Sequence, residues 1–374
     1  MTTSQLTVEV NVPQSDSDDV DTDDLLRVEN LTTTFLTSSG EVTACAGVSL
    51  SLRRGQSLGV VGESGSGKSV LSRSIMGILY QGLTLRRTGV VKYKGRDLVN
   101  LPRKESQRLW GSEMAMVLQD PLTSLNPVTK IGRQLEETIR RHDSQISRTD
   151  AKARALELLR NVGISDPESR RNAYPHHLSG GMRQRVGIAI ALAGNPSLLF
   201  ADEPTTALDV TVQRQILDLL SKLQTELDMG MVLVTHDMGV VATRTDHIMV
   251  MYAGRVVESA PTAKLFADVK MPYTRGLLDA LPAVDRPSHT RLKSIPGYPP
   301  NLANPGSGCR FASRCVAAAD KCREVEPPLL PLTEDPEHLV RCWYPVGSPE
   351  YTAAVAAQAT PEAAAGSLSA SSES

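Results

Sequence analysis

The 374-residue sequence lacks any long hydrophobic run and any export signal. No stretch reaches the roughly 18 uninterrupted apolar residues that a membrane-spanning helix needs. The first residues do not combine a basic start with an apolar stretch, as a secretory signal does. We therefore expect the chain to stay inside the cell, where it can still be a peripheral subunit of a membrane-embedded partner.

The sequence also lacks an excess of charge of one sign. It has no internal repeat that we can find. The chain has 40 basic and 42 acidic residues, which gives a formal net charge of -2. This balance gives no electrostatic reason to expect nucleic acid as a partner. The basic residues between 86 and 108 are expected to form an ordinary solvated face rather than a lipid contact. Any anion site must therefore be local.

Composition divides the chain into four parts. Residues 16–24, DSDDVDTDD, carry six aspartates in nine positions, which predicts a disordered acidic tail over residues 1–24. An Ala- and Ser-rich end predicts a second disordered tail over residues 346–374. Prolines and glycines crowd the chain late in the sequence, so we expect a main domain over 25–281 and a small, separate domain over 282–345.

The main domain has the pattern of an α/β fold. Short β-rich runs come first, and apolar residues then follow helical spacing from Val128 to Gly163, within a helical insertion at about 120–190. Strands return at LLFADE and MVLVTHD, each followed by a helical stretch, which predicts a parallel sheet flanked by helices. The later run HIMVMYAGRVVESA predicts a hairpin that turns at Ala253 and Gly254.

A phosphate-binding loop is predicted directly after an apolar strand. The stretch GESGSGKS fits the P-loop pattern G-x-x-x-x-G-K-[ST] and runs into a helical segment. Its glycines let backbone N–H groups surround phosphate oxygens, Lys68 supplies a charge for the β- and γ-phosphates, and Ser69 supplies a hydroxyl ligand for Mg²⁺. The residues expected to bind ATP here are Gly62, Glu63, Ser64, Gly65, Ser66, Gly67, Lys68, Ser69 and Val70.

Two carboxylates end a later strand. In LLFADE, Asp202 is placed to hold Mg²⁺ through water and Glu203 to act as the general base on the attacking water. Buried strands often end in acidic residues where they reach solvent, so this stretch alone is weak evidence for an ATPase site. Because the chain also has a P-loop, we interpret Asp202 and Glu203 as the opposite side of an ATPase site.

A second phosphate receptor follows in LSGGMRQRVGIAIAL, where Ser179, Gly180 and Gly181 precede a helix. One ATP cannot occupy both receptors if they lie far apart, so we expect a head-to-tail dimer with ATP between the subunits. At this point the chain resembles the nucleotide-binding subunits of ATP-binding cassette (ABC) transporters. The resemblance implies a parallel-sheet core with an antiparallel β subdomain and a helical subdomain.

The family resemblance implies roles for four further residues. Gln119 would touch Mg²⁺ and water and link the nucleotide to a transmembrane partner, Asp209 would act across the dimer, and His236 would contact the γ-phosphate. Phe35 would stack on adenine, although an aromatic residue in a strand is also commonly core. Met182 departs from the family, which usually has Gln there. The catalytic residues are then expected to be Lys68, Gln119, Glu203 and His236.

Three stretches resemble one branch of the family. They are QDPLTSLNP, THDMGVVA and PGYPPNLANPGSGCRFASRC, and they are similar to oligopeptide and dipeptide importers, whose relatives also include nickel importers. The resemblance implies a second cassette, identical or paralogous, two transmembrane permease subunits and an extracytoplasmic peptide-binding protein. The chain would then lie at the cytoplasmic face of the cell membrane and hydrolyse ATP to drive uptake.

One alternative is a soluble ABC ATPase of DNA repair or translation. Such proteins usually carry a long coiled-coil insertion or two cassettes in one chain. This sequence has one cassette and no sustained heptad run. A P-loop kinase outside the ABC family would have no reason to carry LSGG.

Four of the five cysteines cluster late in the chain: Cys309, Cys315, Cys322 and Cys342. Cys45 lies apart in an apolar strand and is expected to be core. The four suggest a tetrathiolate site that would staple a small domain, since stable disulfides are rare in the cytosol. Their spacing matches neither a zinc knuckle nor a common ferredoxin. The importer resemblance implies a [4Fe–4S] cluster, with Zn²⁺ or no metal as alternatives.

Overall fold

The computed structural model describes most of the chain: residues 24–38, 40–79, 84–120, 124–206, 208–281 and 294–358. Apart from Asp24, which begins the first strand, the predicted acidic tail lies outside this part. No helix in the described residues is long and apolar enough to cross a membrane.

A central sheet of eight strands has the order β11-β12-β10-β9-β3-β8-β7-β6. The five strands from β9 to β6 run parallel to one another, which confirms the predicted parallel sheet. The other three strands pair antiparallel, with β10 next to β9. The bounds are β3 Ser57–Val61, β6 Met114–Val117, β7 Leu198–Asp202, β8 Gly230–Thr235, β9 His247–Tyr252, β10 Arg255–Pro261, β11 Leu330–Pro331 and β12 Leu339–Val340.

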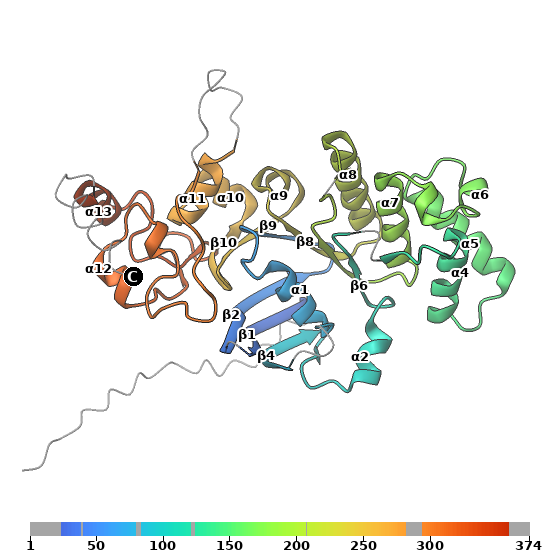
Figure 1. Ribbon diagram of the computed structural model, residues 1–374, viewed down its shortest axis with the longest axis horizontal. Coiled ribbons are helices and arrows are strands. Elements are labelled where there is room, and N and C mark those ends of the chain that lie inside the picture. Colours follow the sequence, from blue (N-terminus) through green and yellow to red (C-terminus); the bar gives the residue numbers. More distant parts are fainter. Residues whose placement is uncertain are drawn as a thin grey trace, which may run out of the picture.

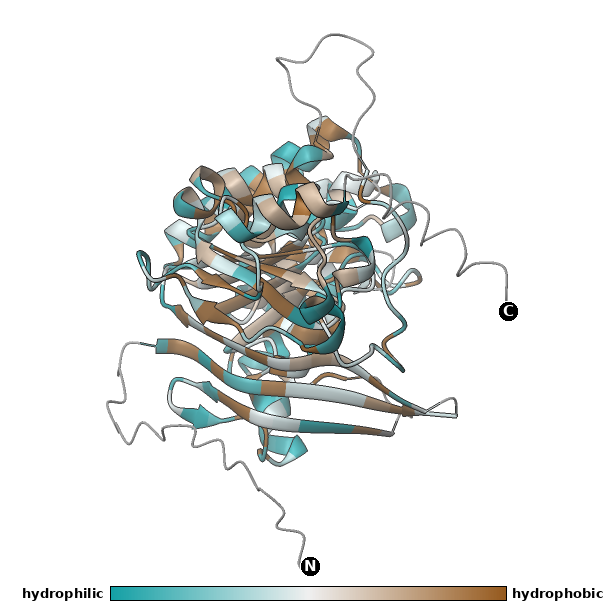
Figure 2. Cartoon of the chain, turned by 90° about the vertical axis from the view of Figure 1, so that its left-hand side faces the viewer, coloured by the Kyte–Doolittle hydropathy of each residue, from teal (hydrophilic) through white to brown (hydrophobic). Residues whose placement is uncertain are grey.

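A second, antiparallel sheet of four strands has the order β2-β1-β4-β5. Figure 1 shows α1 between this sheet and the central one. In Figure 2 the long strands of this sheet alternate between brown and pale or teal residues, as expected for a sheet with one covered face. The bounds are β1 Asp24–Thr37, β2 Gly40–Arg53, β4 Thr84–Tyr93 and β5 Arg96–Asp97.

Helices cover both faces of the central sheet (Figure 1). Their bounds are α1 Lys68–Met76, α2 Arg103–Leu109, α4 Ile131–His142, α5 Arg148–Asn161, α6 Pro167–Arg170, η1 Pro175–His177, α7 Gly180–Ala191, α8 Val210–Glu226, α9 Met238–Arg244, α10 Thr262–Ala267, α11 Pro272–Asp279, η2 Ala312–Arg314, α12 Asp320–Glu324 and α13 Pro349–Gln358, where η denotes a 3-10 helix.

Side chains that alternate along the central strands build one buried cluster on the α1 side of the sheet and two on its other side. In β7, Leu198 and Phe200 pack with α1 and the antiparallel sheet, whereas Leu199 and Ala201 face the helices on the other side. Because both faces are covered, these strands read as continuous apolar runs rather than as polar and apolar residues in turn. This packing fixes the ends of β3 and β7, where the P-loop and the carboxylate pair begin.

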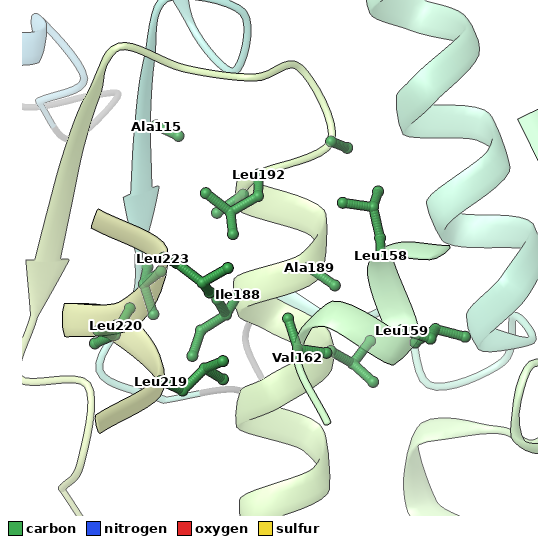
Figure 3. Close-up of a cluster of buried hydrophobic side chains, with 14 of the residues drawn as sticks. Ala115, Leu158, Leu159, Val162, Ile188, Ala189, Leu192, Leu219, Leu220 and Leu223 are labelled. Carbon is green, nitrogen blue, oxygen red and sulfur yellow. The ribbon is translucent and has the colours of Figure 1, made fainter. Parts of the chain in front are cut away.

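The helical insertion forms one end of the molecule and confirms the predicted helices. In α4, Ile131, Leu135 and Ile139 are four apart and all buried. In Figure 3, α7 lies between α5 and α8, with Ile188 of α7 among leucines of both neighbours. The helix α5 ends as expected before Gly163, whose φ of 72° suits a glycine past a helix end.

The hairpin predicted at Ala253 and Gly254 is confirmed. Strands β9 and β10 pair antiparallel, and these two residues have φ values of 47° and 83°. Such positive values at both positions match the two-residue turns that join twisted antiparallel strands.

The C-terminal part differs from the prediction in two ways. It does not stand apart as a satellite, because β12 pairs with β10 and so extends the central sheet. The predicted tail over 346–374 is also wrong in part, since Pro349–Gln358 form helix α13 and the Gln358 side chain donates to the Ala318 carbonyl. Residues 359–374 lie outside the described part. Alanine has the highest helix propensity, so an Ala-rich stretch fits a helix as well as a tail.

Candidate active site

An open cavity of about 570 Å³ surrounds the predicted P-loop, a volume within the range of small-molecule sites. It brings together residues from β2, the P-loop, α1 and the segments after β6, β7 and β8. Its lining residues are Ala44, Glu63, Ser64, Gly65, Ser66, Gly67, Lys68, Ser69, Val70, Gln119, Glu203 and His236.

Two glycines give the P-loop its shape. Gly62 has a φ of 152°, and a Cβ atom there would lie 2.1 Å from the Met251 carbonyl oxygen. Gly67 has a φ of 102°, and a Cβ atom there would lie 2.3 Å from the Ala44 carbonyl oxygen. Both positions therefore exclude a side chain, so the loop keeps its curve against β2 and β9 only with glycine.

Lys68 is a buried cation at the base of this cavity. Its Nζ atom donates to the carbonyl oxygens of Gly62 at 2.8 Å and Glu63 at 3.0 Å, and lies 3.9 Å from Glu203 Oε1. Burial lowers the pKa of Lys68, and the nearby carboxylates of Glu203, Asp202 and Glu63 oppose that shift. A positive charge held away from water attracts a phosphate strongly, because little solvent screens it.

Ser69 lines the cavity, and the buried Asp202 lies directly beside it. The Ser69 hydroxyl donates to Asp202 Oδ1 at 2.7 Å, and Asp202 is 1% exposed. Burial raises the pKa of Asp202, against the Ser69 hydrogen bond and the Arg73 guanidinium 3.8 Å away. Its Oδ2 atom accepts no hydrogen bond within the described residues. A buried carboxylate beside a hydroxyl is the oxygen donor set that Mg²⁺ prefers, so these residues fit that ion.

Glu203 is the point on which the polar side chains converge. Its Oε2 atom accepts from Gln119 Nε2 at 3.0 Å and Thr206 Oγ1 at 3.0 Å, and lies 3.6 Å from His236 Nδ1. Glu203 itself has a φ of 45°, in a backbone region that is uncommon for non-glycine residues. The carboxylate is thus held in one orientation at the mouth of the cavity.

The sequence reasoning missed Thr206. It lies three positions after Glu203, and its hydroxyl bonds to the Glu203 side chain. A threonine in a turn carries no signal by itself, because Ser and Thr hydroxyls more often bond to the backbone nearby. The only available clue was its place in the same turn as the predicted base.

The second predicted phosphate receptor does not line this cavity. Ser179 caps α7 by accepting from the Met182 N–H at 3.3 Å, and Asp209 caps α8 by accepting from the Val212 N–H at 3.0 Å. A Cβ atom on Gly181 would lie 2.5 Å from Val212 Cγ1, so this glycine allows close packing. Figure 1 shows α7 well to one side of α1.

Met182, which departs from the family pattern, has a packing role. It is half-buried and packs against the helical core rather than offering a polar group. The roles of Ser179, Gly180, Gly181 and Asp209 across a dimer remain predictions, because one chain shows only their local contacts.

Phe35 does not line the cavity. It is half-buried in β1, where it pairs with Val42 on one side and Leu85 on the other. Ala44, two positions beyond Val42 in β2, does line the cavity. Adenine stacking by Phe35 therefore stays a prediction.

The four late cysteines line one small space of about 10 Å³, the size of a single water molecule. All are free thiols, as is Cys45, which is fully buried as predicted. No set of three or more His, Cys, Asp or Glu side chains in the described residues is placed to hold a metal ion. The expected cluster or zinc ion is therefore not supported by the arrangement as it stands.

Burial opposes ionisation of these thiols. It raises the pKa of Cys315 to about 11 and that of Cys342 to about 12, and it raises the pKa of Cys309 as well. Backbone N–H groups act the other way, and the clearest is Ala317 N–H, 3.4 Å from Cys315 Sγ. These thiols would need a bound cation to exist as thiolates at neutral pH.

Comparison with known proteins places this site. The family described as "ABC transporter" matches residues 45–206, and "Oligopeptide/dipeptide transporter, C-terminal region" matches residues 257–322. The oligopeptide transport ATP-binding protein OppD of Bacillus subtilis is 48% identical over 319 residues, 85% of this chain and 88% of that protein. The dipeptide transport ATP-binding protein DppD of Lactococcus lactis is 46% identical over 319 residues, 85% of this chain and 90% of that protein.

Solved structures agree. The dimeric post-hydrolysis state of the cassette MJ0796 bound to ADP and Pi has a TM-score of 0.57 and 29% identity, and covers 63% of this chain and 98% of that one. The protein cbiO1 of Clostridium perfringens, part of the ABC transporter complex cbiONQ, has a TM-score of 0.56 and 28% identity over 66% of this chain and 91% of that one. With relatives this similar over most of both chains, the chain belongs to the ABC transporter family of ATP-binding proteins, in the branch that contains OppD and DppD.

Proposed function

We propose that this chain is the ATP-hydrolysing subunit of an importer for dipeptides and oligopeptides. It would lie at the cytoplasmic face of the cell membrane, against two transmembrane permease subunits that an extracytoplasmic peptide-binding protein supplies. The observation that carries the proposal is the Glu203 carboxylate, held by Gln119 and Thr206 at the mouth of the P-loop cavity. The 48% identity to an oligopeptide transport ATP-binding protein supports the cargo.

Catalysis in this proposal is positioning and charge neutralisation. The P-loop N–H groups and Lys68 bind the β- and γ-phosphates, and Ser69 and Asp202 would hold Mg²⁺, which supplies further positive charge at the γ-phosphate. Glu203 orients the attacking water and takes its proton, and His236, an exposed side chain whose Nδ1 atom lies 3.6 Å from Glu203 Oε2, would contact the γ-phosphate.

Dimerisation completes the site. Each cavity would receive Ser179, Gly180, Gly181 and Asp209 from the facing cassette, which is either a second copy or a paralogue. The support is that these residues lie apart from their own chain's cavity and that the similar cassette MJ0796 was solved as a dimer with ADP and Pi. Phe35 would stack on adenine.

We further propose that Cys309, Cys315, Cys322 and Cys342 hold a [4Fe–4S] cluster, with Zn²⁺ as the alternative. The donor set supports this, since all four thiols line one apolar space and at least one sulfur already accepts a backbone N–H. The space is small, so the thiols would have to spread to admit a cluster. Iron and sulfide analysis with a visible spectrum of anaerobically purified protein tests the identity of the metal.

Transport assays test the cargo. A strain lacking this gene is complemented with the wild-type gene or with Lys68→Ala and supplied with labelled dipeptides, labelled oligopeptides or ⁶³Ni²⁺. We expect peptide uptake to return with the wild type alone. Restoration of Ni²⁺ uptake without peptide uptake would contradict the peptide assignment and leave the ATPase assignment intact.

A further inference from the structure

We propose that Arg314 is a positioning residue for the nucleotide site, through which the cysteine-bearing C-terminal segment sets the affinity for ATP. The inference rests on the proposed function of the P-loop cavity as that site. Arg314 follows the P-loop by some 250 positions in the sequence, yet its side chain reaches the loop's second residue, Glu63.

The contact is a bidentate ion pair. Arg314 donates from one terminal nitrogen to Glu63 Oε2 at 2.6 Å and from the other to Glu63 Oε1 at 2.9 Å. The Arg314 side chain is 3% exposed and that of Glu63 is 29% exposed. Two parallel N–H···O bonds fix the plane of the carboxylate as well as its position.

Arg314 is itself held in place from the other sides. Its Nε atom donates to the Pro296 carbonyl at 2.8 Å, and a terminal nitrogen lies 3.3 Å from the Tyr252 hydroxyl. Its guanidinium also lies over the rings of Tyr252 and Phe311, at 5.7 and 6.0 Å. The guanidinium therefore has one orientation, set by β9 and the C-terminal segment together.

Glu63 receives more than this one contact. Its backbone N–H donates to the Tyr273 hydroxyl at 2.8 Å, and its carbonyl accepts from Lys68 at 3.0 Å. Pro299, Pro300 and Leu302 of the C-terminal segment lie beside the loop's residues 63–66. The outer side of the P-loop is thus packed against the C-terminal segment, while its inner side lines the cavity.

The negative charge of Glu63 links the ion pair with Arg314 to the affinity for an anionic ligand. Glu63 lines the same cavity as Lys68 and Ser69. Without Arg314, an uncompensated carboxylate would face a triphosphate and repel it, and the Glu63 side chain would lose the contact that fixes its orientation. Repulsion between the unpaired Glu63 carboxylate and the phosphates should weaken ATP binding about tenfold.

The chain offers a matched control. Arg314 directly precedes Cys315, and Arg341 directly precedes Cys342. Arg341 is half-buried at the junction between β10 and the C-terminal segment, where it donates to the carbonyls of Val256 and Pro327. Because those partners lie in β10 and the C-terminal segment, a change at Arg341 disturbs the junction without touching the P-loop.

The test measures binding and turnover in the purified full-length protein. ATP dissociation constants are measured by titration with a fluorescent ATP analogue, KM and kcat by phosphate release, and folding by thermal unfolding. Arg314→Ala should raise the Kd and the KM about tenfold with kcat changed less than twofold, and Arg314→Lys should fall between. Arg341→Ala should leave the Kd within twofold. Adding Glu63→Gln to Arg314→Ala should recover most of the lost affinity, because the unpaired charge is gone.

Three results would overturn the inference: wild-type affinity in Arg314→Ala, equal weakening in Arg314→Ala and Arg341→Ala, or no recovery in the double variant. If Arg314→Ala does not fold, Arg314→Lys and the double variant carry the same comparison. Failure of the proposed function is distinguishable, since the wild type would then bind ATP no better than Lys68→Ala.

Reciprocity gives a second measurement. If Arg314 couples the C-terminal segment to the nucleotide site, ATP must stabilise that segment by the same factor. Hydrogen exchange of the amides in residues 308–322 should therefore slow when ATP binds to the wild type. The slowing should be lost in Arg314→Ala and kept in Arg341→Ala, and unchanged exchange in the wild type would contradict the coupling.

Discussion

Two regions of this molecule gather chemically active side chains around one space, and the two spaces differ in size and polarity. The P-loop cavity is open, holds about 570 Å³ and is lined by charged and hydroxyl groups. The cysteine space holds about 10 Å³ and is lined mainly by apolar side chains around four thiols. The first suits a charged ligand that enters from water and leaves again, whereas the second has room for about one water molecule unless the thiols move apart.

Burial is the largest cause of the pKa shifts of Lys68 and Cys342. At the P-loop, burial lowers the pKa of Lys68, and the nearby carboxylates oppose that shift. At the cysteines, burial dominates and raises the pKa of Cys342 to about 12. Arg314 connects the two regions, since it bonds to Glu63 of the P-loop and directly precedes Cys315.

The largest effect is expected at Glu203. Glu203→Gln keeps the hydrogen-bond acceptor for Gln119 and Thr206 but loses the base, so ATP hydrolysis should fall by about 10² to 10⁴-fold. Phosphate release measures turnover, and size-exclusion chromatography with Mg·ATP should show dimers that persist. Wild-type turnover would refute the assigned base, and a monomer in the presence of ATP, paralogue and permease would refute the dimer.

The next largest effect separates two glycines of the P-loop. Gly67→Ala places a Cβ atom 2.3 Å from the Ala44 carbonyl, whereas Gly65→Ala meets no atom within 4 Å. Both have a positive φ, so both lose about 1 kcal/mol of stability to backbone strain, and only Gly67→Ala must also move the loop. We expect ATP affinity to fall by more than tenfold in Gly67→Ala and by a smaller factor in Gly65→Ala. Equal losses of ATP affinity in the two variants would mean that the close approach of Gly67 to Ala44 does not determine the shape of the P-loop.

The two regions also differ in how far the sequence predicts them. The P-loop is a contiguous motif between a strand and a helix, and the pair Asp202 and Glu203 ends an apolar strand, so local pattern is enough to find both. Once the sheet is known to be parallel, its strand ends bring these residues to one edge. This explains why nearly all predicted P-loop residues line one cavity.

The C-terminal part could not be predicted in the same way. Strands of two residues such as Leu339–Val340 carry no periodic signal, so their pairing with β10 is invisible in the sequence. The pair of Arg314 with Glu63 joins positions 251 apart, and no local pattern records such a contact. The packing that connects the two regions is therefore a product of tertiary structure alone.

A smaller effect is expected from the cysteines. Cys342→Ala removes one proposed ligand, so bound iron and visible absorbance should be lost and the melting temperature should fall by several degrees, since small modules depend on such staples. Cys45→Ala is the control, because Cys45 is equally a free buried thiol but lies in β2. It should keep the iron. Iron content unchanged in Cys342→Ala, or lost equally in Cys45→Ala, would contradict the proposed site.

The smallest effect is expected at Thr206, and it tests whether the polar side chains around Glu203 act as a set. Thr206→Val keeps the shape but removes the hydroxyl that donates to Glu203 Oε2 at 3.0 Å. A hydrogen bond to a charged carboxylate contributes about 1.5 kcal/mol or more, so kcat should fall about tenfold with KM unchanged, because the residue acts on the base and not on the phosphates. Thr206→Ser restores the donor and should restore kcat. A changed KM, or no rescue by serine, would mean that Thr206 supports the fold of the turn rather than the orientation of the base.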